Sequence, residues 1–295
     1  AAGAVLGAVR AVEPPRRDRP LIGMTSFGKT VLRYMTTLKP ALEARGYEVA
    51  VFHATGMGGR AFEDLARRGY FACVMDFSLQ ELVNDLAGSC VSAGSERLLG
   101  AGRAGVPQIV APGATDMVDF AAWTRCPSQF EGRSVPEHNR LIASVCIDPE
   151  MRRHVARAIA DRLEQATGPT CLLLPMGGVE QWDRPGEALH DPEGLKAFVD
   201  EMCRELGLDP LAVRLKNAAR EGTKSSYGPT YNRIGLVETL EATMAHANLK
   251  VPLGPNQGRG VASGFWFNHG GETSVSLAIG EDGTVTVSVG TPDIG

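Results

Sequence analysis

A glycine-rich loop is the first segment of the sequence whose residues could do chemistry. Residues 51–60 read VFHATGMGGR and lie between an apolar run and the helix-like run AFEDLARRG. Glycine permits positive φ angles and close approach of a ligand, and the next helix would direct free N–H groups and its dipole into the loop. Arg60 could add a bidentate contact to a phosphate or carboxylate. The loop is a candidate anion site, or else a tight turn that binds nothing.

The spacing of the glycines in this loop excludes two common phosphate-binding motifs. No Gly-Lys-Ser or Gly-Lys-Thr follows, so the loop is not a Walker motif, and the six-residue dinucleotide-binding fingerprint is absent. His53, at the end of the apolar run, could act as a general acid–base or donate to a ligand. A histidine satisfied by nearby backbone explains the same position. Both alternatives stay open.

Two further loops carry polar residues of interest. The segment SAGSERL holds Ser92, Gly94 and Arg97, which could bind a ligand or only cap a helix. The segment PEHNR holds His138 and Asn139, which could close over a site or cap a turn. These residues are secondary candidates for ligand binding.

Metal binding is not predicted. Glu81 and Asp85 lie four residues apart in LQELVNDLAG, but no histidine lies at ligand spacing to them, so a solvated helix face is the simpler interpretation. The six cysteines form no Cys-x-x-Cys pair and no Cys/His cluster at zinc spacing. Most lie in apolar runs, which indicates buried reduced thiols and agrees with a cytoplasmic location.

The elements that must position these residues alternate between strands and helices. Short apolar runs (PLIGMTS, YEVAVFH, YFACVMD, VPQIV and PTCLLL) are separated by helix-like segments. The clearest helix is DPEMRRHVARAIADRLEQATG, with Asp148 as its N-cap and Pro149 at the first helical position. The alternation predicts an α/β fold, a Rossmann-like parallel sheet with helices on both faces.

The carboxyl ends of these five runs are where a ligand is expected, because open parallel sheets bind ligands there. The residues that follow the runs are small, hydroxylic, acidic or glycine-rich, as a polar crevice requires. The candidate ligand-binding residues at the strand ends are Thr25, Ser26, His53, Thr55, Gly56, Gly58, Gly59, Arg60, Gly113, Asp116, Gly177 and Gly178.

The pattern changes near residue 207. Two helix-like segments are followed by the runs VASGFWFN, ETSVSLAIG and TVTVSVG, which alternate with period two. A hairpin turn is expected at residues 281–283, between the last two runs. The predicted division is a linker from a missing upstream domain (1–18), a Rossmann-like domain (19–205) and a truncated α+β segment rich in antiparallel strands (206–295).

The composition of the chain argues against some classes of binding partner. The 295 residues are 43% hydrophobic and carry a formal net charge of −4. The sequence has no basic footprint, which argues against nucleic acid as a partner. No window reaches the roughly 18 uninterrupted apolar residues of a membrane helix. These values are typical of an ordinary soluble globular protein.

Several motifs in residues 19–202 resemble one known family. The segments RPLIGMTSFG, LEARGYEVAVFHATGMGGRAFEDL, GSCVSAGSERLLGAGRAGVPQIVAPGATDMVDF and LLLPMGG are similar, in order, to the tobamovirus-resistance-protein-like ATP-binding family. This resemblance implies two Rossmann-like subdomains, of which the chain holds the second, and the binding of ATP or another phosphorylated ligand. It implies ligand contacts from residues 53–60, from Ser92, Gly94 and Arg97, and from His138 and Asn139.

Residues 203–295 resemble an unrelated family. The segments ELGLDPLAVRLKNAAREG and GRGVASGFWFNHGGETSVSLAIGEDGTVTVSVGTPDIG are similar to the molybdopterin-binding large subunit of xanthine dehydrogenase and aldehyde oxidase. This resemblance implies a fragment of an oxidoreductase subunit. Molybdopterin would be bound only if the later segments of that subunit were supplied.

Three functions follow from these observations. The first is a nucleotide- or phosphoanion-binding α/β domain, with or without hydrolase or transferase activity. The second is a fragment of a molybdenum hydroxylase, and the third is a non-catalytic protein-interaction module. The expected partners are a small phosphorylated ligand and either a second copy of the chain or the missing first subdomain. Whether the chain is an enzyme is left open.

Overall fold

The computed structural model describes most of the chain. The described residues are 2–11, 18–133, 135, 139–175, 177–184, 186–224, 230–261 and 274–289. The chain divides into two compact units, Ala1–Gly254 and Pro255–Gly295. The division lies beyond residue 205, and the predicted domain boundary there stays a prediction.

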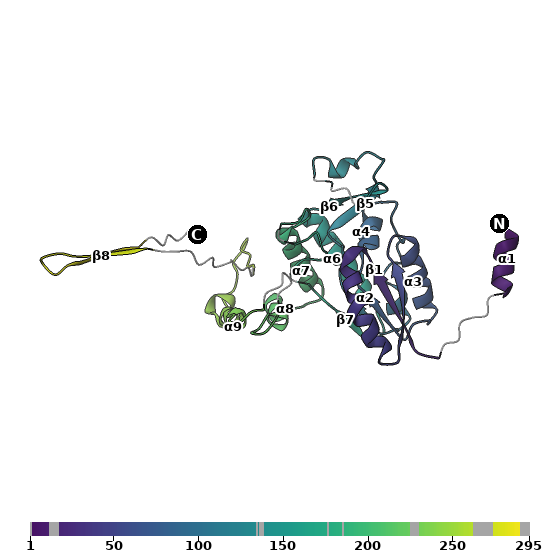
Figure 1. Ribbon diagram of the computed structural model, residues 1–295, viewed down its shortest axis with the longest axis horizontal. Coiled ribbons are helices and arrows are strands. Elements are labelled where there is room, and N and C mark those ends of the chain that lie inside the picture. Colours follow the sequence, from purple (N-terminus) through teal and green to yellow (C-terminus); the bar gives the residue numbers. More distant parts are fainter. Residues whose placement is uncertain are drawn as a thin grey trace. The chain divides into compact units, whose positions relative to one another are not determined.

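A five-stranded parallel sheet organises the first unit (Figure 1). Its strands are β1 (Leu21–Ser26), β2 (Glu48–His53), β3 (Cys73–Asp76), β4 (Gln108–Val110) and β7 (Thr170–Leu172), in the spatial order β2-β1-β3-β4-β7. Each strand coincides with one predicted apolar run, so the α/β fold class is confirmed. The chain leaves β1 toward one edge and returns to add β3 on the other side. The carboxyl ends of β1 and β3 therefore form the topological switch point.

Helices cover both faces of this sheet. They are α2 (Gly28–Glu43), α3 (Met57–Arg67), α4 (Gln80–Leu86), α5 (Gly100–Arg103), α6 (Pro149–Leu163) and α7 (Pro192–Glu205). On one face Val31 of α2 packs with Ile22 and Met75, and on the other Phe62 of α3 packs with Val74. Val74 and Met75 are neighbours on β3, so their opposite directions follow from the two-residue period of a strand. Figure 1 shows α2 and α3 on either side of β1.

A second, antiparallel sheet lies beside α4 and α6. Strand β5 (Met117–Ala121) pairs with β6 (Ile142–Cys146), in a stretch for which the sequence predicted no regular structure. Asp119 interrupts the apolar pattern of β5, but its carboxylate is buried and accepts a hydrogen bond from the Ser144 hydroxyl at 2.6 Å. A buried polar pair of this kind hides a strand from a hydrophobicity pattern. The largest hydrophobic cluster joins these strands to α4, α6 and α7.

The remaining described elements of the first unit are mostly helical. They are α1 (Ala2–Ala11), the 3-10 helices η1 (Ser128–Phe130) and η2 (Ala247–Leu249), α8 (Pro210–Asn217) and α9 (Leu236–Ala245). The start of α6 is as predicted, because the Asp148 side chain accepts from the Met151 N–H at 2.7 Å. Among the described helices, none combines the length and the hydropathy that a bilayer crossing requires.

The cysteines agree only in part with expectation. All six are free, as predicted. Only Cys203 is fully buried, however, and Cys90 and Cys171 are exposed. Apolar sequence context therefore overestimated their burial, because β7, which carries Cys171, ends the sheet's strand order and leaves part of its surface open.

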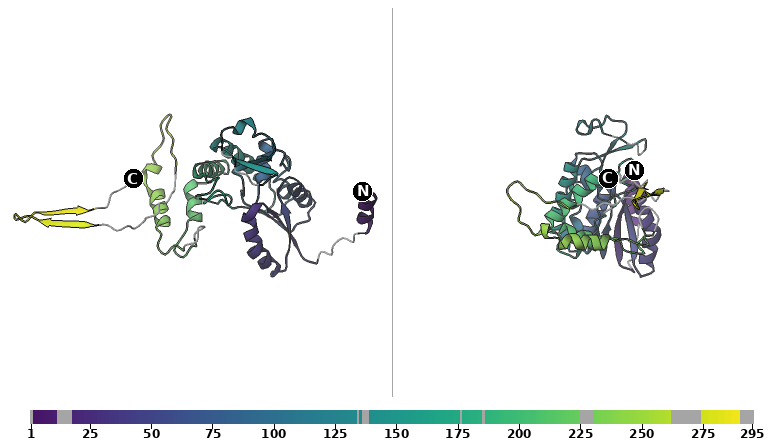
Figure 2. Two further views of the ribbon diagram at one scale, coloured as in Figure 1. Left: turned by 45° about the horizontal axis from the view of Figure 1, so that its top comes forward. Right: turned by 90° about the vertical axis from the view of Figure 1, so that its left-hand side faces the viewer.

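The second unit contains a β-hairpin. Strand β8 (Val275–Ile279) pairs antiparallel with β9 (Val285–Val289), as the period-two pattern predicted, and Figure 2 shows an extended two-stranded ribbon. The turn lies at the predicted position, and Gly283 has a φ of +81°. Every residue of both strands is exposed. The predicted run VASGFWFN lies outside the described residues, Val261 excepted.

Candidate functional site

The glycine loop after β2 holds a carboxylate that belongs to the protein itself. The backbone N–H groups of Gly56 and Gly59 both donate to Oε1 of Glu81, the second at 3.1 Å. Gly56 is the N-cap of α3 with a φ of +97°, and a Cβ at Gly59 would collide with the Glu81 carboxylate. The N-terminus of α3 thus binds an anion, as its free N–H groups and dipole favour. That anion is a side chain of α4.

The predicted environment of Glu81 was wrong. Glu81 is fully buried, whereas the sequence placed it with Asp85 on a solvated helix face. Asp85 is half-buried and accepts a hydrogen bond from the Ser92 hydroxyl at 2.6 Å. In the part of the chain that the structure describes, no group of three His, Cys, Asp or Glu side chains is arranged to hold a metal ion.

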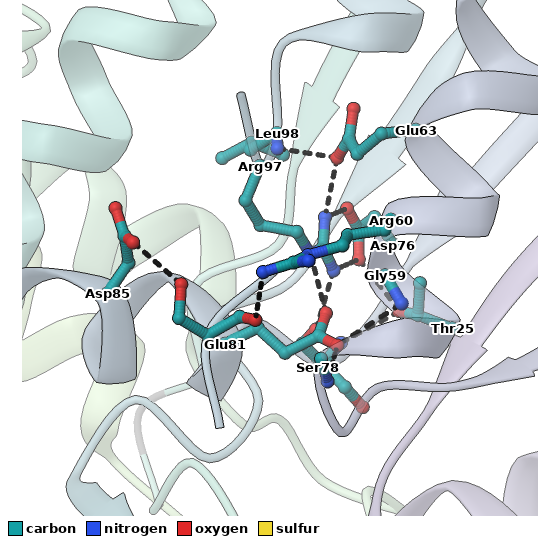
Figure 3. Close-up of polar contacts among 12 residues, drawn as sticks. Thr25, Gly59, Arg60, Glu63, Asp76, Ser78, Glu81, Asp85, Arg97 and Leu98 are labelled. Carbon is teal, nitrogen blue, oxygen red and sulfur yellow. Dashed lines mark hydrogen bonds and ion pairs between the residues drawn. The ribbon is translucent and has the colours of Figure 1, made fainter. Parts of the chain in front are cut away.

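Arg97 organises the interior between the two glycine-containing loops (Figure 3). Its side chain is fully buried. Nε donates to Glu81 at 2.9 Å, and Nη1 donates to Glu63 at 2.9 Å. Nη2 donates to Asp76 at 2.7 Å and to the carbonyl oxygen of Ser78 at 2.8 Å. Because all three guanidinium nitrogens donate to protein oxygens, Arg97 holds the loops together instead of presenting a free donor to a ligand.

This Arg97 cluster places three carboxylates around one guanidinium. Burial raises the pKa of Glu63 and outweighs the attraction of Arg97. Burial lowers the pKa of Arg97, but the neighbouring carboxylates together hold it well above its usual value. The N–H groups of Leu98 and Gly100 also donate to Glu63, at 2.5 and 2.7 Å. The buried charges are therefore both paired and hydrogen-bonded, which buried ion pairs require.

Thr25 ties the carboxyl ends of β1 and β3 together. Its hydroxyl donates to Asp76 at 2.7 Å and accepts from the N–H groups of Phe77 and Ser78, at 2.9 and 3.1 Å. The side chain is fully buried. Thr25 therefore shapes the strand ends from inside the protein.

The predicted residues at the ends of β1 and β2 also contact each other. Nδ1 of His53 lies 3.2 Å from the carbonyl oxygen of Ser26, and its ring stacks on Phe27 with the centroids 6.1 Å apart. This is the arrangement in which the histidine is satisfied by backbone. The N–H of Thr55 donates to the His53 carbonyl at 3.0 Å, and Gly58 packs against the same carbonyl.

The second predicted loop lies against the first. The Ser92 carbonyl oxygen accepts a long hydrogen bond from Arg60, at 3.4 Å, and packs over Gly56. The Ser92 hydroxyl accepts from the Gly94 N–H at 2.8 Å. Arg60 keeps an exposed guanidinium. The structure therefore brings the two loops together, as a shared site would need, but much of their polar surface is used internally.

The third predicted loop is partly described. Oδ1 of Asn139 accepts from the N–H groups of Leu141 and Ile142, at 2.7 and 3.0 Å. Asn139 therefore caps the turn before β6. His138 lies outside the described residues.

A cavity of about 1270 Å³ lies at the carboxyl ends of β1, β3, β4 and β7. Its walls come from the segments that follow these strands and from α8. It includes the switch point between β1 and β3, where open α/β sheets bind ligands. Of the predicted residues, Gly113, Gly177 and Gly178 line it.

The cavity combines an aromatic wall with the N-terminus of a helix. Phe27, Phe77 and Trp182 line it, together with Gly28 and Lys29, the first two residues of α2. Both Gly28 and Lys29 are exposed, and no side chain caps this end of α2. The helix dipole and the Lys29 ammonium favour negative charge at this point.

An acidic group also borders the cavity. Glu180 lines the cavity, and Asp116 is fully buried nearby. Burial raises the pKa of Glu180 to about 7, and the charge of Asp183 adds to this, although backbone N–H groups of residues 181–183 act in the opposite direction. Burial also raises the pKa of Asp116 well above its usual value, and the negative charge of Glu180 adds to the effect. A carboxyl that titrates near neutrality at a cavity wall is a candidate acid–base or binding group.

Sequence reasoning missed Lys29 and Glu180. Lys29 follows the first apolar run and Gly28, at the start of a helix-like segment, so its place near the carboxyl end of the first strand could have been predicted. Glu180 lies in GGVEQWD after the fifth run, next to the predicted Gly177 and Gly178. Its raised pKa depends on burial, which the local sequence does not reveal.

Comparison with known proteins matches most of the first unit to one family. A family described as "Uncharacterised protein family (UPF0261) C-terminal domain" matches residues 19–221. A UPF0261 protein of Brucella melitensis is 56% identical over 202 residues, which are 68% of this chain and 48% of that protein. A UPF0261 protein of Clostridium tetani is 37% identical over 214 residues, which are 72% of this chain and 53% of that protein.

A plant protein is similar over the same region. The ToMV resistance protein Tm-1(GCR237) of Solanum lycopersicum is 34% identical over 181 residues, which are 61% of this chain and 24% of that protein. The first resemblance read from the sequence is thus confirmed at the level of the family. The chain spans about half the length of the bacterial relatives. The comparisons give no support to the resemblance with molybdenum hydroxylases, and the family match runs on to residue 221.

Proposed function

This chain belongs to the UPF0261 family, and from that premise we propose that it binds a phosphorylated small molecule, of the nucleotide kind, in the cavity at the carboxyl ends of β1, β3, β4 and β7. The described residues that line the cavity lie within residues 27–217.

The observation that carries the proposal is that one cavity joins an anion-attracting helix end to a flat apolar wall. Gly28 and Lys29 begin α2 there, and a phosphate group beside them gains from the dipole and from a charge-assisted hydrogen bond. Phe77 and Trp182 offer aromatic surface on which a planar base can stack. A volume of about 1270 Å³ is ample for a nucleotide-sized ligand.

The glycine loop of residues 56–60 is the weaker position for the phosphate. A ligand there would compete with Glu81 for the N–H groups of Gly56 and Gly59. Moving Glu81 away would also remove a partner of the fully buried Arg97. Because breaking this buried hydrogen-bonded network would cost stability, we assign the phosphate to the start of α2.

The other two functions read from the sequence have less support. The molybdenum hydroxylase hypothesis rests on residues 203–295, for which the comparisons supply no relative of that kind. The interaction-module hypothesis rests on the tomato relative, whose name attributes resistance to ToMV to that protein. In the described part of the chain, neither of these two hypotheses is supported by a structural feature as specific as the cavity.

Titration calorimetry with ATP, ADP and inorganic pyrophosphate at pH 7 tests the proposal. Lys29→Ala is expected to weaken nucleotide binding about tenfold, the worth of one charge-assisted hydrogen bond. Arg60→Ala is the matched control, since it removes an exposed cation from the other loop, and it should change affinity less than twofold. Loss of binding in Arg60→Ala but not in Lys29→Ala would move the site to the glycine loop.

Tryptophan fluorescence, measured with the same nucleotides, tests where the base of the nucleotide binds. The chain has three tryptophans, of which Trp182 lines the cavity and Trp123 is exposed elsewhere. Nucleotide should quench the emission of the wild type and of Trp123→Phe, but not that of Trp182→Phe. If no probe binds the wild type, the proposed function is wrong.

A further inference from the structure

The segment that carries Glu180 is fixed in place at the cavity wall. The N–H of Ala114 donates to the carbonyl oxygen of Val179 at 3.2 Å, which joins the segments after β4 and β7. The Asp183 carboxylate accepts from the N–H of Val179 at 3.0 Å. Gly178 has a φ of +124°, and a Cβ there would collide with the Asp183 backbone. Hydrogen bonds and close packing therefore fix the backbone next to Glu180, and with it the position of this residue at the cavity.

Behind this wall lies a carboxylate without a partner. Asp116 is fully buried, and no hydrogen bond from a described residue reaches either of its carboxylate oxygens. The same is true of Oε1 of Glu180. Buried polar groups are normally hydrogen-bonded, so an unpaired carboxylate beside a cavity marks a place where a proton or a ligand completes the structure.

The charges around Glu180 are mostly negative. The charge of Asp183, on the same segment, raises the pKa of Glu180, and the charges of Glu180 and Asp183 raise that of Asp116, just before β5. Arg152 of α6 is the buried cation behind them, but its Nη2 reaches Asp191 at 3.2 Å and the Cys146 sulfur at 3.6 Å. His190 approaches Asp183 at 3.6 Å.

The cavity itself adds charges of both signs. Arg184 comes from the same segment as Glu180, Lys29 from α2, and Asp209 and Lys216 from α8. The Arg184 side chain is bonded to the Gln181 carbonyl at 2.8 Å. An anion in the cavity would therefore meet both cations and the Glu180 carboxylate.

We propose that the cavity takes up one proton together with its anionic ligand, and that Glu180 carries this proton. The inference rests on the proposed function, because it concerns the same cavity. As a carboxylate, Glu180 would repel a phosphate in a partly desolvated space. As a carboxylic acid, it is neutral and its O–H can donate to a phosphate oxygen. Since burial already brings the pKa of Glu180 to about 7, little is needed to add the proton at neutral pH.

Calorimetry of ATP binding to the whole chain at pH 7, in two buffers that differ in ionisation enthalpy, measures the proton uptake directly. About half a proton per ATP is expected for the wild type, because a group with a pKa near the working pH is half protonated before binding. Affinity should fall about tenfold between pH 6 and pH 8, as for a ligand that binds only the protonated form.

Glu180→Gln imitates the protonated form, because its amide is neutral and can donate. It should bind ATP at pH 8 about tenfold more tightly than the wild type and take up no proton through residue 180. The titration of ATP itself is common to both proteins, so their difference isolates Glu180. Glu193→Gln is the matched control: it removes one exposed carboxylate at the start of α7 and should behave like the wild type.

The outcomes separate the two proposals. If ATP binds and the wild type and Glu180→Gln share one pH dependence, the proton inference is overturned while the proposed function stands. If uptake is lost in His190→Asn and kept in Glu180→Gln, the proton is carried by His190 and the inference is also overturned. If ATP does not bind the wild type at any pH from 6 to 8, the proposed function itself fails. Uptake by the wild type can be read even if a variant does not fold.

Discussion

The Arg97 cluster and the acidic group around Glu180 are built from the same kinds of residue but are completed differently. In each, one buried arginine faces several carboxylates. Arg97 donates to Glu63, Asp76 and Glu81, and backbone N–H groups complete two of these. Arg152, in contrast, donates a hydrogen bond to one carboxylate in the described part of the chain, that of Asp191. No described residue donates a hydrogen bond to the Asp116 carboxylate.

The difference separates a structural cluster from a candidate functional one. Where every buried donor and acceptor has a partner inside the protein, a ligand has nothing to add, and removing a member costs stability. Where buried donors and acceptors beside a cavity lack partners, a proton or ligand supplies what is missing. The first type should therefore respond to mutation through folding, and the second through binding and pH.

Arg97→Met gives the largest effect expected from this comparison. The substitution keeps much of the volume but leaves three carboxylates without their cation, so the free energy of unfolding should fall by about 3–5 kcal/mol. Urea unfolding followed by circular dichroism measures the loss. Arg103→Met is the control, because Arg103 forms an exposed ion pair with Glu96 and should cost less than about 1 kcal/mol. Equal losses in the two variants would mean that the Arg97 cluster is not a structural centre.

Gly59→Ala tests the glycine loop with an intermediate effect. The added methyl group would collide with the Glu81 carboxylate, and shifting a packed side chain should cost about 1–3 kcal/mol. Gly235→Ala, at a helix N-cap with open space around it, should cost less than about 1 kcal/mol. The midpoint of urea unfolding compares them. A Gly59→Ala protein as stable as the wild type would show that Glu81 is not needed in the loop.

The sequence predicted the parallel sheet because each of its strands lies in a short, continuous apolar run followed by a helix-like segment. The same criterion failed for β5, where Asp119 is buried and bonded to Ser144 of β6. That pairing joins residues 25 positions apart, and a local pattern does not contain it. The start of α6 was predictable, because its signal, Asp148 followed by Pro149, lies within one turn.

For the site, the sequence predicted the edge of the sheet but not which loop is open. Gly113, Gly177 and Gly178 follow strands and line the cavity. The loop of residues 56–60 has the stronger motif, yet Glu81 fills it from another helix. Whether a glycine loop is occupied by a ligand or by a side chain depends on tertiary packing, which one chain read locally does not reveal.

Glu180→Gln gives the smallest expected change in stability. The variant should gain stability relative to the wild type, whereas Arg97→Met should lose it, and this opposite sign distinguishes the two clusters. A carboxyl whose pKa is raised from 4.5 to about 7 in the folded state binds its proton more tightly there than in the unfolded chain. Its contribution to stability is therefore complete below pH 4.5 and is lost as the pH rises through about 7. Glutamine has no such loss.

Thermal unfolding at pH 5, 6, 7 and 8 should therefore show Glu180→Gln gaining on the wild type as the pH rises, by on the order of 1 kcal/mol at pH 8, since the group is only partly buried. Glu193→Gln should run parallel to the wild type at every pH, because its carboxylate is exposed. If Glu180→Gln also runs parallel, Glu180 is ionised at neutrality like any surface carboxylate. The acidic group would then be as fully compensated as the Arg97 cluster, and the contrast between the two would disappear.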